Sequence, residues 1–358
     1  MDISTTRTSS PTSDERLAEI LANPGFGTHF TDHMFTVEWT PDGWSGARIT
    51  PYGPLTLDPA TAVLHYAQEI FEGMKAYRHE DGSVWTFRPE ANAERMQRSA
   101  RRLALPELPT DYFLESLRQL IAMDADWVPT ADETSLYLRP FMFAKEAFLG
   151  VRPANKVNYY VIASPAGAYF TGGVAPVSIW LTTEHSRAGV GGTGAAKTGG
   201  NYAASLLAQA EASDNGCAQV LFLDSVEHKW VEELGGMNIV LVHKDGTILT
   251  PQSDSIHAGV TRDSILQLAE DRGHKVEHRP VSIDEWRAGV ESGDIVEMFA
   301  CGTAAVVTPI AQVKSAEFTI GSADAPAGEL TMSLRQELTD IQYGRVADRH
   351  GWMTRLDA

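Results

Sequence analysis

The segment Gly191-Gly192-Thr193-Gly194-Ala195-Ala196-Lys197-Thr198-Gly199-Gly200-Asn201-Tyr202 places one lysine among glycines and small residues, directly before a helical pattern over residues 203–212. Glycines let a ligand approach the backbone closely. A lysine with few polar neighbours loses hydration, which favours the uncharged, nucleophilic amine. Lys197 is therefore the best candidate in the chain for Schiff-base chemistry.

Two other interpretations of this segment stay open at the level of the residues. Residues 191–198 match the phosphate-binding pattern G-x-x-x-x-G-K-[ST], except that Ala196 replaces the second glycine. That glycine makes the tight turn that aims backbone N–H groups at phosphate, so a P-loop nucleotide hydrolase is a remote alternative. A surface loop with an ordinary solvated lysine is the second.

Six motifs in the chain resemble, in the same order, those of the branched-chain amino acid aminotransferases, which are pyridoxal-phosphate enzymes of fold type IV. The resemblance runs from about Phe30 to Tyr343. The motifs are Phe71-Glu72-Gly73-Met74-Lys75, Phe87-Arg88-Pro89 with Arg95-Met96, Ser135-Leu136-Tyr137-Leu138-Arg139-Pro140, Lys197-Thr198-Gly199-Gly200-Asn201-Tyr202, Glu233-Leu234-Gly235-Gly236-Met237-Asn238 and Gly302-Thr303-Ala304.

The resemblance implies a mixed α/β (α+β) fold with two domains. A smaller N-terminal α/β domain is expected at residues 30–166, after a tail and lead-in at residues 1–29. A linker at residues 167–176 leads to a larger cofactor-binding domain, a pseudo-barrel, at residues 177–358. The strands and helices do not alternate strictly, which argues independently against a doubly wound sheet.

For the cofactor, pyridoxal 5'-phosphate, the resemblance implies a role for each residue that matches a family position. Lys197 is the attachment and proton-transfer group, and Tyr202 hydrogen-bonds the phenolic oxygen. Glu233 faces the pyridine nitrogen. The phosphate is expected to contact Arg95, Thr303 and the backbone of Val260 and Thr261.

The substrates implied are branched-chain L-amino acids and 2-oxo acids such as 2-oxoglutarate. Tyr137 with the Thr303 and Ala304 amides resembles the site for the α-carboxylate, and Arg139 the group that captures the distal carboxylate of glutamate. The expected apolar wall consists of Phe30, Tyr66, Tyr169 and, from a partner subunit, Val151, which implies a homodimer. Phe30 and Tyr66 also suit ordinary core positions.

Related activities share much of this pattern. D-amino acid aminotransferases and aminodeoxychorismate lyase have the same lysine, glutamate and phosphate cup, and Tyr137-Leu138-Arg139 favours the branched-chain enzymes over them. A protein that only stores a phosphorylated ligand leaves Lys197, Tyr202 and Glu233 unexplained. Ala305 and Thr308 replace the cysteine pair of animal members, so no thiol control is expected there.

Two local patterns have a physical meaning of their own. Glu232 and Glu233 are adjacent on a predicted strand, so they point to opposite faces and one of them faces inward. Gly259-Val260-Thr261 precedes a predicted helix, with Thr261 as its N-cap, and a helix N-terminus attracts anions.

Composition excludes several partners. Twenty-nine basic and 47 acidic residues give a net charge of −18, which disfavours nucleic acid and anionic lipid. Two cysteines, Cys217 and Cys301, and no secretory pattern indicate the cytoplasm. The histidine pairs at 29/33 and 274/278 lack a third ligand, so no metal is expected. Residues 1–14, rich in serine and threonine, are expected to be disordered.

Periodicity predicts the main elements. A helix is expected to start at Pro89, and others to cover residues 111–123, 203–212, 262–271 and 330–341. Strands are expected at residues 157–163, 177–182, 219–223, 230–234, 238–243, 247–250 and 295–300.

Overall fold

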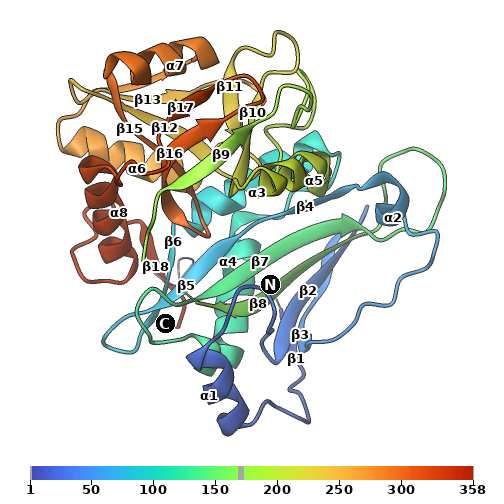
Figure 1. Ribbon diagram of the computed structural model, residues 1–358. Helices are drawn as coiled ribbons and strands as arrows, with labels where there is room; N and C mark the ends of the chain where they lie inside the picture. Colours follow the sequence, from blue (N-terminus) through green and yellow to red (C-terminus); the bar gives the residue numbers. More distant parts are fainter. Residues whose placement is uncertain (1, 168–172, 358) are drawn as a thin grey trace. The chain divides into compact units, whose positions relative to one another are not determined.

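The computed structural model describes residues 2–167 and 173–357 (Figure 1). Contacts divide the chain into two compact units, each with its own sheet and helices, which confirms a mixed α/β chain of two domains. The first unit takes in Met1–Tyr169, Ala196–Gly199 and Asp340–Ala358, and the second Phe170–Ala195 and Gly200–Thr339. The domain limits suggested by the sequence remain a proposal, and the contacts differ from them in grouping Ala196–Gly199 and Asp340–Ala358 with the first unit.

The sheet of the first unit has, among the described residues, the strand order β1-β3-β2-β8-β7-β5-β6-β18, with β4 paired to β7. The long strands β7 and β8 are antiparallel neighbours in its middle. The strands are β1 (Ser4–Thr5), β2 (His33–Thr40), β3 (Gly43–Pro51), β4 (Glu69–Phe71), β5 (Met74–Arg78), β6 (Val84–Phe87), β7 (Ser135–Ala144), β8 (Val157–Ala166) and β18 (Met353–Arg355).

Strand β8 extends further than predicted. The sequence placed the start of an interruption at Ser164, but β8 continues to Ala166. The ladder with β7 keeps its register to the end, where Ala166 lies opposite Ser135. Backbone hydrogen bonds to an already formed neighbour therefore outweigh the local turn signal of Pro165.

The helices of the first unit are α1 (Asp14–Ala22), α2 (Val63–Tyr66), α3 (Pro89–Arg102) and α4 (Thr110–Asp124), followed by a 3₁₀ turn at Ala125–Trp127. Pro89 is the first residue of α3, as predicted. Helix α4 confirms the helix expected at 111–123, and its buried face packs onto the sheet beside Phe35 and Tyr159. That face consists of Phe113, Leu117, Leu120 and Ile121.

The prediction of a disordered N-terminus is wrong for residues 2–13. Strand β1 pairs in parallel with β3, and the backbone N–H of Thr8 donates to His33 Nε2 at 3.0 Å. The Thr12 hydroxyl donates to Asp32 at 2.8 Å. Hydrogen bonds to a folded partner order this segment although it buries little apolar surface.

The sheet of the second unit follows the order β11-β10-β9-β16-β15-β12-β13-β14, with β17 paired to β16. Strand β11 also contacts β12 and β13, so the sheet curls into the expected pseudo-barrel. The strands are β9 (Val177–Leu181), β10 (Gln219–Leu223), β11 (Val231–Leu234), β12 (Asn238–His243), β13 (Ile248–Pro251), β14 (Val276–Arg279), β15 (Ile295–Gly302), β16 (Val306–Lys314) and β17 (Thr319–Gly321).

The remaining helices are α5 (Gly199–Asp214), α6 (Val260–Asp271), α7 (Ile283–Ser292) and α8 (Glu329–Gln342). Helices α5, α6 and α8 confirm the three predicted in this half, and α7 was not predicted. Trp286 on α7 is fully buried in the core of the second unit. Among the described residues, no helix is long and apolar enough to cross a bilayer.

Candidate active site

Lys197 lies in the first unit, and its backbone is held on both sides. Its N–H donates to the Ser99 hydroxyl at 2.9 Å, and its carbonyl accepts from the N–H of Phe71 at 3.0 Å. Its Nζ lies 4.9 Å from the centre of the Phe71 ring. The N–H of Gly199 donates to Glu69, and a Cβ at this glycine would lie 2.5 Å from Glu69 Oε1. The glycine is therefore required by close packing, and the lysine is presented from a fixed backbone.

A buried ion pair accompanies Lys197. Arg95 donates through Nε and Nη2 to the two oxygens of Glu72, at 2.8 and 2.7 Å, and Asn92 adds a third hydrogen bond at 2.8 Å. Burial raises the pKa of Glu72, but Arg95, with a further contribution from Lys197, outweighs this effect and lowers it. Glu72 is thus a buried anion that orients Arg95. The sequence motif contained Glu72, but no role was predicted for it.

Tyr137 and Arg139 lie two residues apart on β7 and so share one face of the sheet. Arg139 Nη2 donates to the Tyr137 hydroxyl at 3.1 Å, and its guanidinium lies 4.8 Å from the centre of the Phe71 ring. A Cβ at Gly73 would lie 2.0 Å from the same hydroxyl, so only glycine fits there. Phe26, which the sequence did not suggest, packs edge-on against Tyr137 at 5.1 Å.

The residues expected to form an apolar wall have different surroundings. Phe30 stacks on Tyr52 with ring centres 5.0 Å apart. Tyr66, at the end of α2, donates its hydroxyl to the carbonyl of Leu149. Val151 is 88% exposed. Tyr169, the remaining member of the predicted wall, lies outside the described residues.

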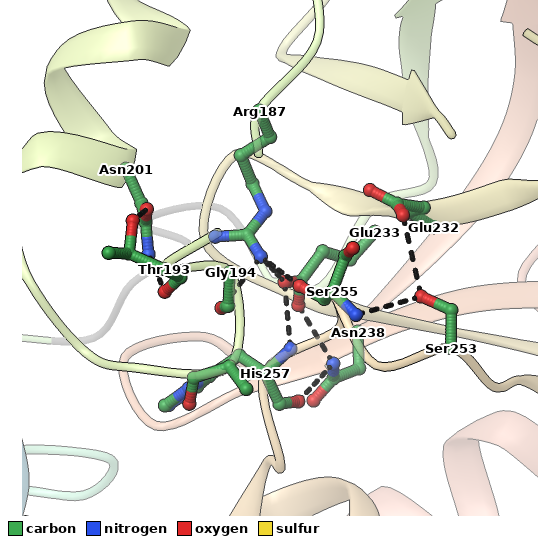
Figure 2. Close-up of polar contacts among 11 residues, drawn as sticks. Arg187, Thr193, Gly194, Asn201, Glu232, Glu233, Asn238, Ser253, Ser255 and His257 are labelled. Atoms are coloured by element: carbon green, nitrogen blue, oxygen red, sulfur yellow. Dashed lines mark hydrogen bonds and ion pairs between the residues drawn. The ribbon is translucent and has the colours of Figure 1, made fainter. Parts of the chain in front are cut away.

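Glu233 lies on β11 in the second unit and is surrounded by donors (Figure 2). Arg187 Nη2 lies 2.6 Å from its Oε1, which also accepts from the N–H of His257 at 3.0 Å. Asn238 Nδ2 donates to Oε2 at 3.0 Å. A guanidinium and two N–H donors favour the charged form of a buried carboxylate. The sequence did not point to Arg187, because it stands alone outside any motif.

Glu232, its neighbour on β11, is buried as well, since both side chains are only 3% exposed. The opposite faces of the strand are both inside the unit, whereas the sequence indicated one inward-facing carboxylate. Ser253 donates a long hydrogen bond of 3.4 Å to Glu232 Oε1, and Oε2 is buried without a partner in the part of the chain that the structure describes. Burial raises the pKa of Glu232 to about 7.

This raised pKa predicts a pH-dependent stability. Between the ordinary value of 4.5 and about 7, the folded protein retains a proton that the unfolded chain releases. The stabilisation is therefore complete below pH 4.5 and is lost as the pH rises toward 7. We expect Glu232→Gln to raise the free energy of unfolding by about 2 kcal/mol at pH 8 and by much less at pH 5.

Urea unfolding at the two pH values measures this difference. Glu184→Gln is the matched control, because Glu184 is exposed. An equal effect of Glu232→Gln at pH 5 and pH 8 would contradict a buried carboxyl that titrates near neutrality.

The first turn of α6 offers donors for an anion. Helix α6 begins at Val260 with Gly259 as its N-cap, so the prediction that Thr261 caps the helix is wrong. Close packing requires a glycine at this cap, because a Cβ at Gly259 would lie 2.0 Å from Asn238 Oδ1. The N–H groups of a first turn have no acceptor within their helix. Val260 and Thr261 are the first two residues of α6, so they still lie where the predicted anion site would need them.

Thr303 and Ala304 lie in the turn between β15 and β16, whose ends pair Gly302 with Val306. Val306 has a φ of 61°, a left-handed conformation that is unusual for a β-branched residue. Such strain is found where a turn must keep one shape. Tyr202 lies in the first turns of α5, beside Gly236.

The histidine pairs give no metal centre in the described residues, where no group of three or more histidine, cysteine, aspartate or glutamate side chains is arranged to hold an ion. His33 has a structural role, because its Nδ1 lies 2.7 Å from Asp124 Oδ1 while Nε2 accepts from Thr8.

Comparisons with known proteins agree with this arrangement. The class IV amino-transferase family matches residues 69–313, more than half of the chain. A branched-chain-amino-acid aminotransferase of Mycolicibacterium smegmatis is 57% identical over 365 residues, covering 100% of this chain and 99% of that protein. Branched-chain-amino-acid aminotransferase 2 of Bacillus subtilis is 45% identical over 335 residues, covering 93% and 92%.

Solved structures agree too. The branched-chain amino acid aminotransferase of Escherichia coli superposes with a TM-score of 0.76 at 25% identity, covering 91% of this chain and 99% of that one. A T.th. branched-chain amino acid aminotransferase with pyridoxamine 5'-phosphate gives a TM-score of 0.75 at 28% identity, covering 90% and 98%. The chain belongs to the class IV aminotransferases and, within them, to the branched-chain-amino-acid aminotransferases.

Proposed function

We propose that this enzyme transfers the amino group between branched-chain L-amino acids (leucine, isoleucine and valine) and 2-oxoglutarate, with pyridoxal 5'-phosphate as cofactor. The observation that carries the proposal is Lys197, a primary amine on a rigidly held backbone, next to the buried Glu72–Arg95 pair. The T.th. enzyme has been solved with N-(5'-phosphopyridoxyl)-L-glutamate and with 4-methylvaleric acid, which supports both substrate classes.

The described residues fit this cofactor. Glu233 is a buried carboxylate that Arg187, Asn238 and the His257 N–H keep negatively charged, as a protonated pyridine nitrogen requires. Asn238 also donates to the carbonyl of His257 at 3.0 Å, close in sequence to the first turn of α6. A carboxylate and an anion-binding turn are therefore linked by one amide side chain.

In the proposed mechanism, each residue has one task. When bound, the cofactor supplies a reactive carbonyl and a ring that accepts electrons from the substrate Cα. Lys197 would hold the cofactor, and its free amine would take up a proton from the substrate Cα. Glu233 holds the proton on the pyridine nitrogen, and Tyr202 hydrogen-bonds the phenolic oxygen. Arg95, Thr303 and the backbone N–H groups of Val260 and Thr261 bind the phosphate.

The proposed substrate contacts divide between two carboxylates and a side chain. Tyr137 with the Thr303 and Ala304 amides binds the α-carboxylate, and Arg139 binds the distal carboxylate of glutamate. The branched side chain packs against an apolar wall made of Phe30, Tyr66, Tyr169 and Val151 of a partner subunit. The 88% exposure of Val151 suits a residue that a second copy covers, so we propose a homodimer.

We also propose a cytoplasmic location. Cys217 and Cys301 are free and buried, as suits a reducing compartment.

The proposed binding of the distal carboxylate by Arg139 leads to a specific prediction. Its Nε is buried without a partner among the described residues, so the guanidinium retains hydrogen-bonding capacity. We expect Arg139→Ala to raise the KM for glutamate or 2-oxoglutarate about 10- to 100-fold more than it raises the KM for leucine. This difference corresponds to about 1.5–3 kcal/mol, as for a hydrogen bond to a charged group.

Steady-state kinetics with both donors test it, and Arg98→Ala, an exposed arginine on α3, is the control. Equal losses for leucine and glutamate would assign Arg139 to the α-carboxylate or to the structure of the site.

A further inference from the structure

Arg187 is a buried arginine that the proposed mechanism does not use directly. It lies in the second unit between β9 and α5, and its side chain is 4% exposed. One nitrogen, Nη2, lies 2.6 Å from Glu233 Oε1 and donates to the carbonyls of Gly194 at 2.9 Å and Ser255 at 2.6 Å (Figure 2). Three separate segments of the chain thus converge on one guanidinium group.

The Gly194 contact matters because Gly194 stands only three residues before Lys197. A Cβ at this glycine would lie 2.4 Å from the Ser255 carbonyl, so the two backbones are in close contact. Thr193, the preceding residue, exchanges two hydrogen bonds with Asn201 of α5, at 2.7 and 2.8 Å. The loop that leads to the lysine is therefore held by Arg187 on one side and by α5 on the other.

The charges around Arg187 are unbalanced. Glu233 pairs with it directly, and Glu232 on the same strand also feels its charge. Ser253, Ser255, Asn238 and the His257 N–H supply the other polar contacts of the two carboxylates. An unpaired buried carboxylate is costly and takes up a proton instead. Without Arg187, two adjacent buried acids on β11 would lose the guanidinium charge that acts on both of them.

We infer that Arg187 is a positioning residue, which keeps Glu233 ionised and correctly oriented and at the same time fixes the loop that leads to Lys197. Arg187 acts through Glu233 and through the Gly194 carbonyl, not by contact with substrate. The first part of this inference rests on the proposed function, in which Glu233 faces the pyridine nitrogen. The second part concerns the protein alone.

The test compares Arg187→Met with Arg187→Lys. Methionine removes the charge at similar length, whereas the three N–H groups of a lysine ammonium match the three oxygens around Nη2. We expect Arg187→Met to lower kcat for leucine about 10- to 100-fold, as for the loss of a hydrogen bond to a charged group, with KM changed by less than about threefold. Arg187→Lys should restore most of the turnover. Arg287→Met is the control, because Arg287 is half-exposed and pairs with Glu291.

A double-mutant cycle identifies the route of the effect. If Arg187 affects turnover through Glu233, the double variant Arg187→Met/Glu233→Gln should have a kcat less than about twofold below that of Glu233→Gln alone. The dissociation constant of pyridoxal 5'-phosphate from the apoprotein, followed by fluorescence quenching, should show the same lack of additivity. Additive losses, or failure of lysine to restore turnover, would mean a merely structural arginine and would overturn the inference.

Hydrogen exchange of the apoprotein tests the loop without cofactor or substrate. Backbone amides in residues 188–196 should exchange at least about tenfold faster in Arg187→Met than in wild type or Arg287→Met, because an opened loop loses protection. Unchanged exchange there would overturn the second part. Failure of the proposed function would appear differently, as a wild-type protein that does not transaminate leucine.

Discussion

Replacing Lys197 by alanine is expected to reduce leucine transamination by about 10⁴-fold or more, because in the proposed mechanism this one side chain both holds the cofactor and moves the proton. The backbone at this position is held by Ser99 and Phe71, so the alanine variant should keep the fold while losing the amine. Single-turnover and steady-state assays with leucine measure the loss. Lys156→Ala, at an exposed lysine, should retain wild-type activity.

Chemical mapping gives an independent check of the same residue. Borohydride reduction of the holoenzyme, followed by peptide mass analysis, should place the pyridoxyl group on Lys197. A label on another lysine would show that the reactive amine had been assigned wrongly, even if Lys197→Ala were inactive.

The second large effect is expected at Glu233. Glu233→Gln should retain the cofactor but lose about 10²- to 10³-fold in turnover, because a preorganised charge in a buried site contributes to catalysis on this scale. The amide nitrogen would also face other donors, Arg187 and the His257 N–H, at the place where an acceptor now lies. Absorbance of the bound cofactor and kcat for leucine report the two quantities separately.

Glu232→Gln is the matched control for this prediction, since the two residues are adjacent and equally buried. Its kcat at neutral pH should change by less than about fivefold. A larger loss for Glu232→Gln than for Glu233→Gln would mean that the two faces of β11 had been interchanged.

Local signals in the sequence accounted for most of the elements. Helical spacing located α4 and α8, and short continuous apolar runs located β10 and β12 with the ends that the structure shows. These features depend only on a few neighbouring residues, so they can be recognised in the sequence before the fold is known. Tyr137 and Arg139 were identified only through the resemblance, and the structure shows that they share one face of β7.

Contacts between segments that are distant in the sequence could not be predicted in this way. Arg187 meets Glu233 and Ser255, and Glu72 meets Arg95, only after the chain has folded. The need for glycine at the N-cap of α6 comes from its contact with Asn238, which no helix pattern encodes. The docking of Thr12 on Asp32 likewise opposed a composition typical of disorder. The roles of all the residues assigned to the cofactor and substrate, Lys197 and Glu233 included, remain predictions.

The Glu72–Arg95 pair also bears on how the chain folds when no ligand is bound. Because Glu72 neutralises Arg95 inside the chain, the polypeptide has no lone buried cation at that point before a cofactor arrives. We therefore expect the chain to fold at this point without a bound ligand, so that a ligand could bind to a protein that is already folded.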